Sequence, residues 1–279
     1  MKHSLILLFF VAHSCIAQEW QAEIGAGAAG YNGDLTKRNF SFKTIGPELN
    51  IGFKYSFDNL IILRGDVSWA HVKGDDKFNK EELRTRNLRF QSNILEGSVC
   101  VEVNLLEPEI FTVYPYLFGG IGVFHFNPYT YDKTNTKRYL QPLGTEGQGL
   151  PQYPGRKKYS LTQLCFPMGM GMKFRLNDKY DLAFEIGYRV LTTDYLDDVS
   201  TTYVDLEALA LARGPIAAEL SSRHDLGFQG VDAVRGNPDV KDWYYFGNFK
   251  LIFHLNKVFQ AKKKKKDEDS ENIAPDSGN

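Results

Sequence analysis

Eight charged residues stand at alternate positions in segments whose other positions are apolar, and they are the first candidates for chemistry. Successive side chains of a strand point to opposite faces, so these charges would share one face of a sheet. If that face lines a closed barrel, opposite charges are expected to pair, because buried ions need partners. An ion or substrate path is the functional alternative. The residues are Arg64, Asp66, Glu96, Glu102, Lys173, Arg175, Glu185 and Arg189.

Histidine, cysteine and methionine suggest no catalytic centre. A hydrolase or acyltransferase in a membrane needs a nucleophile, a base and an orienting group within reach of one another. No serine or carboxylate stands at a suggestive spacing from a histidine, and no His or Cys pair has zinc spacing. We therefore expect no enzyme: no catalytic residues, no metal and no cofactor. The scattered histidines are His71, His125, His224 and His254.

Two smaller groups of residues have both a structural and a functional interpretation. Asp194, Asp197 and Asp198 resemble a calcium loop, but the glycine and the closing glutamate of an EF-hand are missing. Calcium binding there is the lesser alternative. Cys100 and Cys165 are expected to lie on non-adjacent strands as free thiols.

The segments that carry the charges alternate with a period of two, which is typical of strands. Between Ile45 and Phe57 the alternation continues for 13 residues. Strands of soluble proteins usually have about five or six residues, whereas tilted membrane strands have about 9–11. We predict eight strands, at 20–31, 45–57, 61–69, 95–105, 113–126, 163–175, 182–190 and 243–256.

Long and short connections alternate along the chain. The long ones are 32–44, 72–90, 127–160 and 193–242, and the short ones lie near 57–60, 106–109 and 177–180. This alternation is typical of outer-membrane barrels, whose short turns face the periplasm. The sequence therefore predicts an all-β fold, an eight-stranded antiparallel transmembrane β-barrel with long extracellular loops and both termini in the periplasm.

Prolines and one helical segment interrupt this pattern. Pro47 and Pro115 are expected near the rims of the barrel, and Pro167 is expected to mark a bulge, since proline removes a ladder donor. Residues 205–213 have good helix-forming sequence, which Gly214-Pro215 breaks. A short helical insert in the last loop is predicted, either closing the lumen or presenting a contact face.

Both ends of the chain are expected to lie outside the barrel. Residues 1–17 have a basic start, an apolar run and small residues before Gln18, as in a signal peptide of an exported protein. Residues 18–259 would form the barrel. Residues 260–279 contain Lys262–Lys266 followed by acidic residues, which predicts a disordered periplasmic tail. The net charge of −1 gives no reason to expect nucleic acid as a partner.

Four segments resemble the PorG-like family of outer-membrane barrels: 31–35, 115–128, 140–150 and 193–203. The resemblance extends from about Glu19 to Leu255 and implies a component of the type IX protein secretion system. Such a component would anchor the periplasmic ring, built from a lipoprotein and its partner protein, at the outer membrane. The loop residues that carry the resemblance are Gly144, Thr145, Glu146, Gly147, Gln148, Gly149, Tyr195, Leu196, Asp197 and Asp198.

The leading hypothesis is thus a non-enzymatic scaffold of a secretion apparatus in the Gram-negative outer membrane. Its expected partners are outer-membrane lipid, the ring lipoprotein and the ring protein, with no nucleic acid and no small-molecule substrate. A generic structural barrel of the OmpA-like kind, or a narrow pore, remains the alternative.

Overall fold

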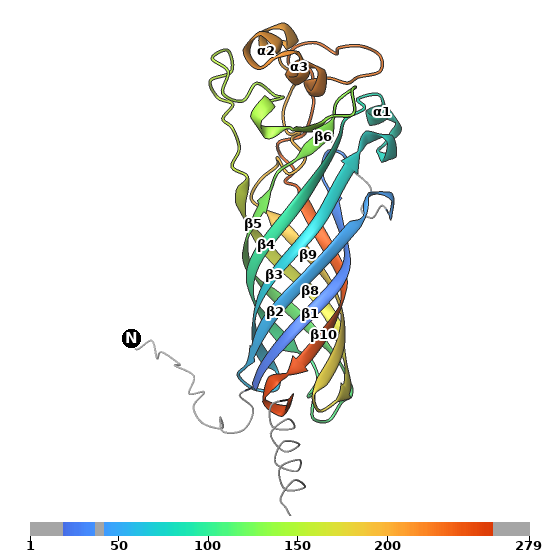
Figure 1. Ribbon diagram of the computed structural model, residues 1–279, viewed down its shortest axis with the longest axis vertical. Helices are drawn as coiled ribbons and strands as arrows, with labels where there is room; N and C mark the ends of the chain where they lie inside the picture. Colours follow the sequence, from blue (N-terminus) through green and yellow to red (C-terminus); the bar gives the residue numbers. More distant parts are fainter. Residues whose placement is uncertain (1–18, 37–41, 259–279) are drawn as a thin grey trace, which may run out of the picture.

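The computed structural model describes residues 19–36 and 42–258, so the expected signal peptide and charged tail lie outside the described residues. Within these residues, eight long antiparallel strands pair in chain order, and pairing of the first with the last closes a barrel (Figure 1). The strands are β1 (Glu19–Asn32), β2 (Gly46–Ser56), β3 (Ile61–Asp75), β4 (Arg89–Asn104), β5 (Val113–Phe126), β8 (Thr162–Asn177), β9 (Tyr180–Leu191) and β10 (Trp243–His254).

Burial alternates along these strands, as the period of two predicts. In β2 every second residue from Gly46 onward is buried, and the residues between them are exposed or half-buried. Apolar side chains such as Ile51, Phe53 and Val99 point outward and are more than half exposed. The charged side chains of the other parity are buried inside the barrel. The predicted antiparallel barrel of eight strands is confirmed.

Short and long connections separate the two ends of the barrel. The end formed by residues 57–60, 105–112 and 178–179, here called the turn end, also holds the first residues of β1 and the last of β10 (Figure 1). At the other end, residues 33–36, 42–45, 76–88, 127–161 and 192–242 fold over the barrel and are here called the cap.

Helices and two short strands give the cap its own structure. The predicted helical insert is present as α2 (Leu206–Arg213) and α3 (Pro215–Ser221), broken at Gly214. Both helices lie above the strands at the far end of the molecule (Figure 1). The remaining elements are α1 (Glu81–Arg84), β6 (Tyr129–Tyr131), β7 (Lys137–Tyr139) and 3-10 turns at Phe42–Thr44, Asp76–Phe78 and Gln141–Leu143.

Strands β3 and β4 are longer than the sequence suggested. They stay paired up to Asp75 and Arg89, so the connection between them is 76–88 rather than 72–90. Outward positions at this end carry His71, Lys73 and Asn93 instead of aliphatic residues. The hairpin therefore extends beyond the apolar band, where the apolar alternation used for the prediction no longer applies.

The prediction of a β-bulge at Pro167 is wrong. On the β9 side, Pro167 pairs with Arg189 within an unbroken register. On the β5 side, the register is the same before and after the proline, with only the pairs beside it missing. The Pro167 carbonyl lies near Gly119, so the absent N–H falls on this side and costs ladder bonds without a bulge. A register shift occurs instead between Arg175 and Asn177.

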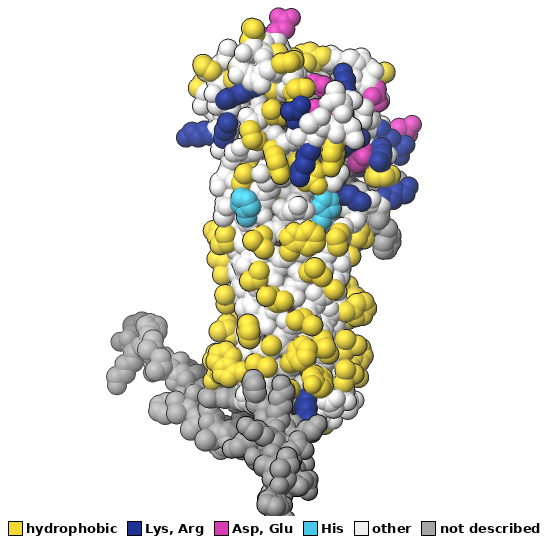
Figure 2. Space-filling view, viewed as in Figure 1, with side chains coloured by type: hydrophobic (Ala, Val, Ile, Leu, Met, Phe, Trp, Pro, Cys, Tyr) yellow, Lys and Arg dark blue, Asp and Glu magenta, His cyan; other side chains and the backbone are white. Residues whose placement is uncertain are grey.

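On the face shown in Figure 2, apolar side chains cover the strands in a band, and charged side chains gather on the cap. Aromatic residues lie at both edges of the band. Trp20 contacts Tyr55 near the turn end, at a ring distance of 4.9 Å, and Tyr188 contacts Trp243 near the cap, at 5.3 Å. No helix among the described residues is long and apolar enough to cross a bilayer.

Candidate functional site

The middle of the lumen is filled by a network of ion pairs, some between neighbouring strands and some across the barrel. Lys54 Nζ lies 2.8 Å from Glu23 Oε2 and 2.9 Å from Glu102 Oε2. Lys173 forms a further ion pair with Glu102. Because these side chains are at most 2% exposed, each charge depends on its partners rather than on water.

Arg64 is the second centre of this network. Its Nε lies 2.7 Å from Asp66 Oδ2, and its Nη1 lies 2.5 Å from Glu185 Oε2. The guanidinium also lies over the ring of Phe118, 4.3 Å from its centroid. Lys250 bridges Glu185 and Glu23 at 3.2 and 2.9 Å and so joins both halves of the network.

The described residues of this network carry equal numbers of cations and carboxylates. Lys54, Arg64, Lys173 and Lys250 face Glu23, Asp66, Glu102 and Glu185. Aromatic residues fill the remaining space: the Tyr116 hydroxyl donates to Glu185 Oε2 at 2.8 Å. A Cβ on Gly171 would lie 2.4 Å from the Tyr116 ring, so this ring requires glycine on the facing strand. The side chains thus fill this part of the lumen, and their formal charges balance.

A second layer lies between the network and the cap. Arg189 Nε contacts Glu96 Oε2 at 3.1 Å, and the Tyr244 hydroxyl donates to the same oxygen at 2.7 Å. Above it, the rings of Phe126 and Tyr159 stack at 6.2 Å, and Tyr159 stacks on Tyr195 at 4.8 Å. The core thus changes from ionic to aromatic toward the cap.

Glu146 is the centre of hydrogen bonding in the cap. Its carboxylate accepts from the Ser200 and Thr201 backbone N–H groups and from the Tyr195 hydroxyl, and Arg235 Nη1 lies 2.9 Å away. Asp198 accepts from the hydroxyls of Thr145 and Tyr159. Burial raises the pKa of Asp198 to about 6 despite the nearby charge of Arg235.

These contacts join the two loop segments that carry the family resemblance, 144–149 and 195–198. Gly144, Gly147 and Gly149 have φ between 59° and 77°, which allows the first segment to turn tightly around Gln148. The Gln148 side chain in turn accepts from the backbone N–H of Glu146. The segments therefore build the cap's interior, beneath α2 and α3.

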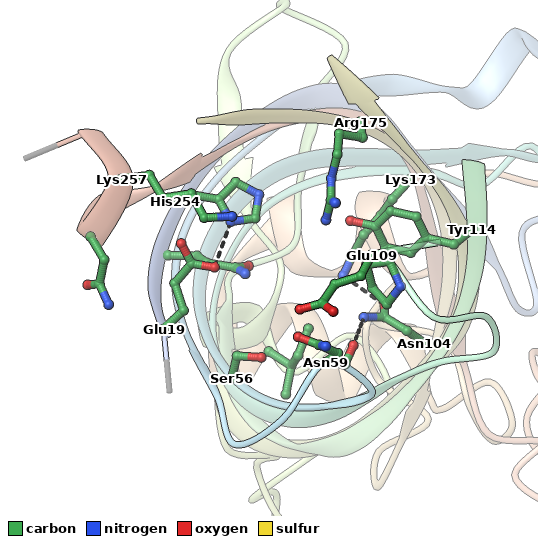
Figure 3. Close-up of a pocket in the computed structure, with 14 residues that line it drawn as sticks. Glu19, Ser56, Asn59, Asn104, Glu109, Tyr114, Lys173, Arg175, His254 and Lys257 are labelled. Carbon is green, nitrogen blue, oxygen red and sulfur yellow. Dashed lines mark hydrogen bonds and ion pairs between the residues drawn. The ribbon is translucent and has the colours of Figure 1, made fainter. Parts of the chain in front are cut away.

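A small cavity of about 260 Å³ opens at the turn end of the lumen (Figure 3). His254 lies there between two carboxylates, with Nδ1 2.9 Å from Glu19 Oε2 and Nε2 3.0 Å from Asp181 Oδ2. The Tyr114 hydroxyl donates to the same Asp181 oxygen at 2.6 Å. Since both ring nitrogens of His254 meet carboxylate oxygens, the imidazolium form suits this geometry.

Seven of the eight charged residues singled out in the sequence lie buried in the lumen, and Arg175 does not. Its side chain is 23% exposed at the rim, with Nε 3.9 Å from Asp181 Oδ1. Sequence reasoning missed Glu23, Lys54 and Lys250, although Lys54 and Lys250 stand on the polar parity of their strands. It also missed the carboxylates beside His254, because Glu19 and Asp181 are far from it in the sequence, although they lie on the two strands that pair with β10.

The remaining candidates are also placed by the structure. Cys100 and Cys165 are buried free thiols on β4 and β8, with β5 between them, as expected. Asp194, Asp197 and Asp198 are buried in the cap. Within residues 19–36 and 42–258, no three His, Cys, Asp or Glu side chains are arranged to hold a metal ion.

Residues 2–214 match the family model described as "Domain of unknown function (DUF6089)". The chain belongs to the DUF6089 family. The match includes both loop segments that meet in the cap and all of the ion-pair network except Lys250. No curated protein matches the chain.

Several solved membrane barrels are similar in shape at low identity. Neisserial surface protein A (NspA) is 10% identical with a TM-score of 0.43, over 84% of this chain and 96% of that one. The Yersinia pestis attachment invasion locus protein Ail, solved with the heparin analogue sucrose octasulfate, is 10% identical with a TM-score of 0.39, over 85% and 100%. A major outer membrane protein from Thermus thermophilus is 11% identical with a TM-score of 0.41, over 85% and 99%.

Proposed function

We propose that this member of the DUF6089 family is a non-enzymatic barrel of the outer membrane that anchors the periplasmic ring of the type IX secretion system. In this orientation the cap is extracellular and the turn end faces the periplasm. The ring lipoprotein and the ring protein are its proposed partners, as in the PorG-like family.

The observation that carries the membrane part is the inverted distribution of side chains. Leu49, Phe53 and Met170 are more than half exposed on the outside, whereas Lys54 and Glu102 are fully buried inside. A soluble protein rarely exposes a continuous apolar surface of this extent. In a bilayer the same band lies against lipid tails, and aromatic residues at its edges suit the headgroup level.

The filled lumen supports an anchoring role. Ion pairs, stacked rings and the cap follow one another along the barrel axis, and eight strands leave an interior just wide enough for side chains. The PorG-like role itself is supported by the resemblance of segments 31–35, 115–128, 140–150 and 193–203.

Affinity purification tests the secretion role directly. A tagged copy would be isolated from detergent-solubilised outer membrane and analysed by mass spectrometry. We expect the ring lipoprotein and the ring protein in stoichiometric amounts, and loss of cargo secretion when the gene is deleted. A barrel that comes out alone after mild crosslinking, with secretion intact in the deletion strain, would refute this role.

The second candidate is a narrow pore, or a generic structural barrel without a ring partner. Planar bilayers separate the pore from the anchor. Because Arg64 and Lys250 fill the lumen with their partners, we expect no conductance steps from the purified protein. Steps of reproducible size would favour the pore and show that the ion-pair network opens.

A further inference from the structure

Four aspartates gather where the cap joins the barrel. Asp34 follows β1, Asp194 and Asp197 follow β9, and Asp242 precedes β10; each is at most 6% exposed. The Tyr31 hydroxyl donates to Asp197 and lies 3.3 Å from Asp242 Oδ1. These four carboxyl groups, here called the aspartate group, hold the 192–242 connection against the end of β1.

The carboxyl group of Asp194 is left without proper partners. Both of its oxygens are buried, and neither has a hydrogen-bond partner of good geometry, although the Ser200 side chain lies nearby as a donor. By contrast, Asp242 Oδ2 accepts from the Leu196 N–H at 2.9 Å, and Asp197 Oδ1 accepts from the Val199 N–H at 2.8 Å. A buried, unpaired carboxylate is costly unless it binds a proton.

The cations around the aspartate group are committed elsewhere or exposed. Arg86 faces Asp34 and Asp197, but its guanidinium makes a two-pronged contact with Asp76, at 2.7 and 2.8 Å. Lys80 and Lys241 line an open cavity beside Asp34.

On the cap side, the cation Arg235 is likewise paired with a carboxylate outside the aspartate group. Arg235 is bonded to Glu146 and faces Asp198, and Glu146 adds a further negative charge facing Asp194. Among the described residues, Asp194, Asp197 and Asp242 therefore have no ion pair to balance their charge.

Burial and neighbouring charge act in the same direction on these groups. Burial raises the pKa of Asp194 to about 7, and the nearby carboxylate of Asp34 adds to the effect. Burial followed by the repulsion of neighbouring aspartates also raises the pKa of Asp197 and of Asp242 above the ordinary range. All three lie in the cap, outside the apolar band.

We propose that the aspartate group is a proton-dependent latch, in which protons held by Asp194, Asp197 and Asp242 keep the cap seated on the barrel. When the protons leave, the aspartates repel one another, and segment 192–205 separates from the end of β1. The latch belongs to the fold of the cap and does not depend on a secretion role.

The sign of the pH dependence follows from the raised pKa values. A carboxyl group that is easier to protonate in the folded state favours folding most at low pH. Its contribution is lost as the pH rises from the ordinary range near 4 through its folded value, which for Asp194 is about 7. The cap is therefore held most strongly on the barrel in mild acid and least strongly above neutral pH.

Hydrogen exchange of the whole chain in detergent, compared between variants at the same pH, tests the latch. Asp194→Asn removes the ionisable group, and Asp239→Asn removes an exposed charge from the same connection as a matched control. Comparison at one pH cancels the intrinsic dependence of exchange on hydroxide. Peptides covering 192–205 report on the latch, and peptides from β9 report on the barrel.

At pH 8 we expect segment 192–205 of the unchanged protein to exchange about tenfold faster than in Asp194→Asn, as one ionised buried group would cause. At pH 5 the two should agree within about twofold. The control variant should behave as the unchanged protein, and β9 should not differ. Asp242→Asn provides the same comparison if Asp194→Asn fails to fold.

Two results would overturn the latch. The first is an equal exchange ratio at pH 5 and pH 8. The second is a loss of the excess exchange at pH 8 when millimolar Ca²⁺ is added, because a bound cation rather than bound protons would then hold the cap.

Discussion

The ion-pair network in the middle of the barrel and the aspartate group beneath the cap are both buried, yet their charges are arranged in opposite ways. In the network, Lys54 and Arg64 each contact more than one carboxylate within hydrogen-bond distance. In the aspartate group, Asp194 has no ionic partner at such a distance. Buried charges are thus stabilised by ion pairing in the network, whereas the buried carboxyl groups of the aspartate group are stabilised by protonation.

The comparison indicates how different parts of a barrel are specified. A buried ion pair in the lumen favours one register of the strands, since removing either partner leaves a buried charge. A cluster of like charges with raised pKa values, such as that of Asp194 at about 7, responds to pH near neutrality. The ion-pair network suits the rigid barrel, and the aspartate group suits a cap that can separate from it.

The largest effect is expected from breaking the network at its most connected carboxylate. Glu102→Gln leaves Lys54 and Lys173 facing a neutral amide, so we expect a loss of about 3–5 kcal/mol in the free energy of unfolding. Urea unfolding in detergent micelles measures it, with the exposed Glu82→Gln as the control. A loss no greater than that of the control would mean that the network does not stabilise the barrel.

Removing a charge from the aspartate group should stabilise the protein instead of destabilising it. At pH 8, Asp194→Asn is expected to raise the free energy of unfolding by about 1–2 kcal/mol, because it removes a buried ionised group without a partner. The gain should vanish at pH 4, where the aspartate is protonated. If the variant is less stable at both pH values, the Asp194 carboxyl group makes a stabilising contact in either protonation state, which would contradict this prediction.

The smallest effect is expected at the rim. Arg175→Gln removes a partly exposed guanidinium whose nearest carboxylate oxygen is 3.9 Å away, so the change should stay below about 1 kcal/mol. Arg64→Gln, measured in the same way, is the matched comparison within the lumen. Equal losses for the two arginines would contradict the distinction between rim and network.

Much of the barrel could be predicted from the sequence, because the alternation of apolar and polar residues has a direct physical cause. A strand with lipid or solvent on one face and a packed lumen on the other must alternate, as residues 46–56 do. Arg64, Glu102 and Glu185 could therefore be assigned to the lumen before any contact was known. The alternation of long and short connections likewise predicted which connections share one end of the barrel.

Local rules were less successful where the neighbouring strand decides the outcome. Pro167 was expected to need a bulge, yet β9 holds its register, and the cost falls on a few bonds to β5. The ends of β3 and β4 were misplaced because the hairpin continues beyond the apolar band, where its outward residues become polar.

The sequence alone determined the class of fold, the inward parity and the helical insert, since each depends on periodicity or on the preference of a short segment. Tertiary structure alone decided which charges meet. His254 lies between Glu19 and Asp181, and Asp34 lies near Asp194 and Asp242, through closure of the barrel and folding of the cap. Electrostatic pairing depends on distance in space, and residues far apart in the sequence approach one another only after the chain has closed.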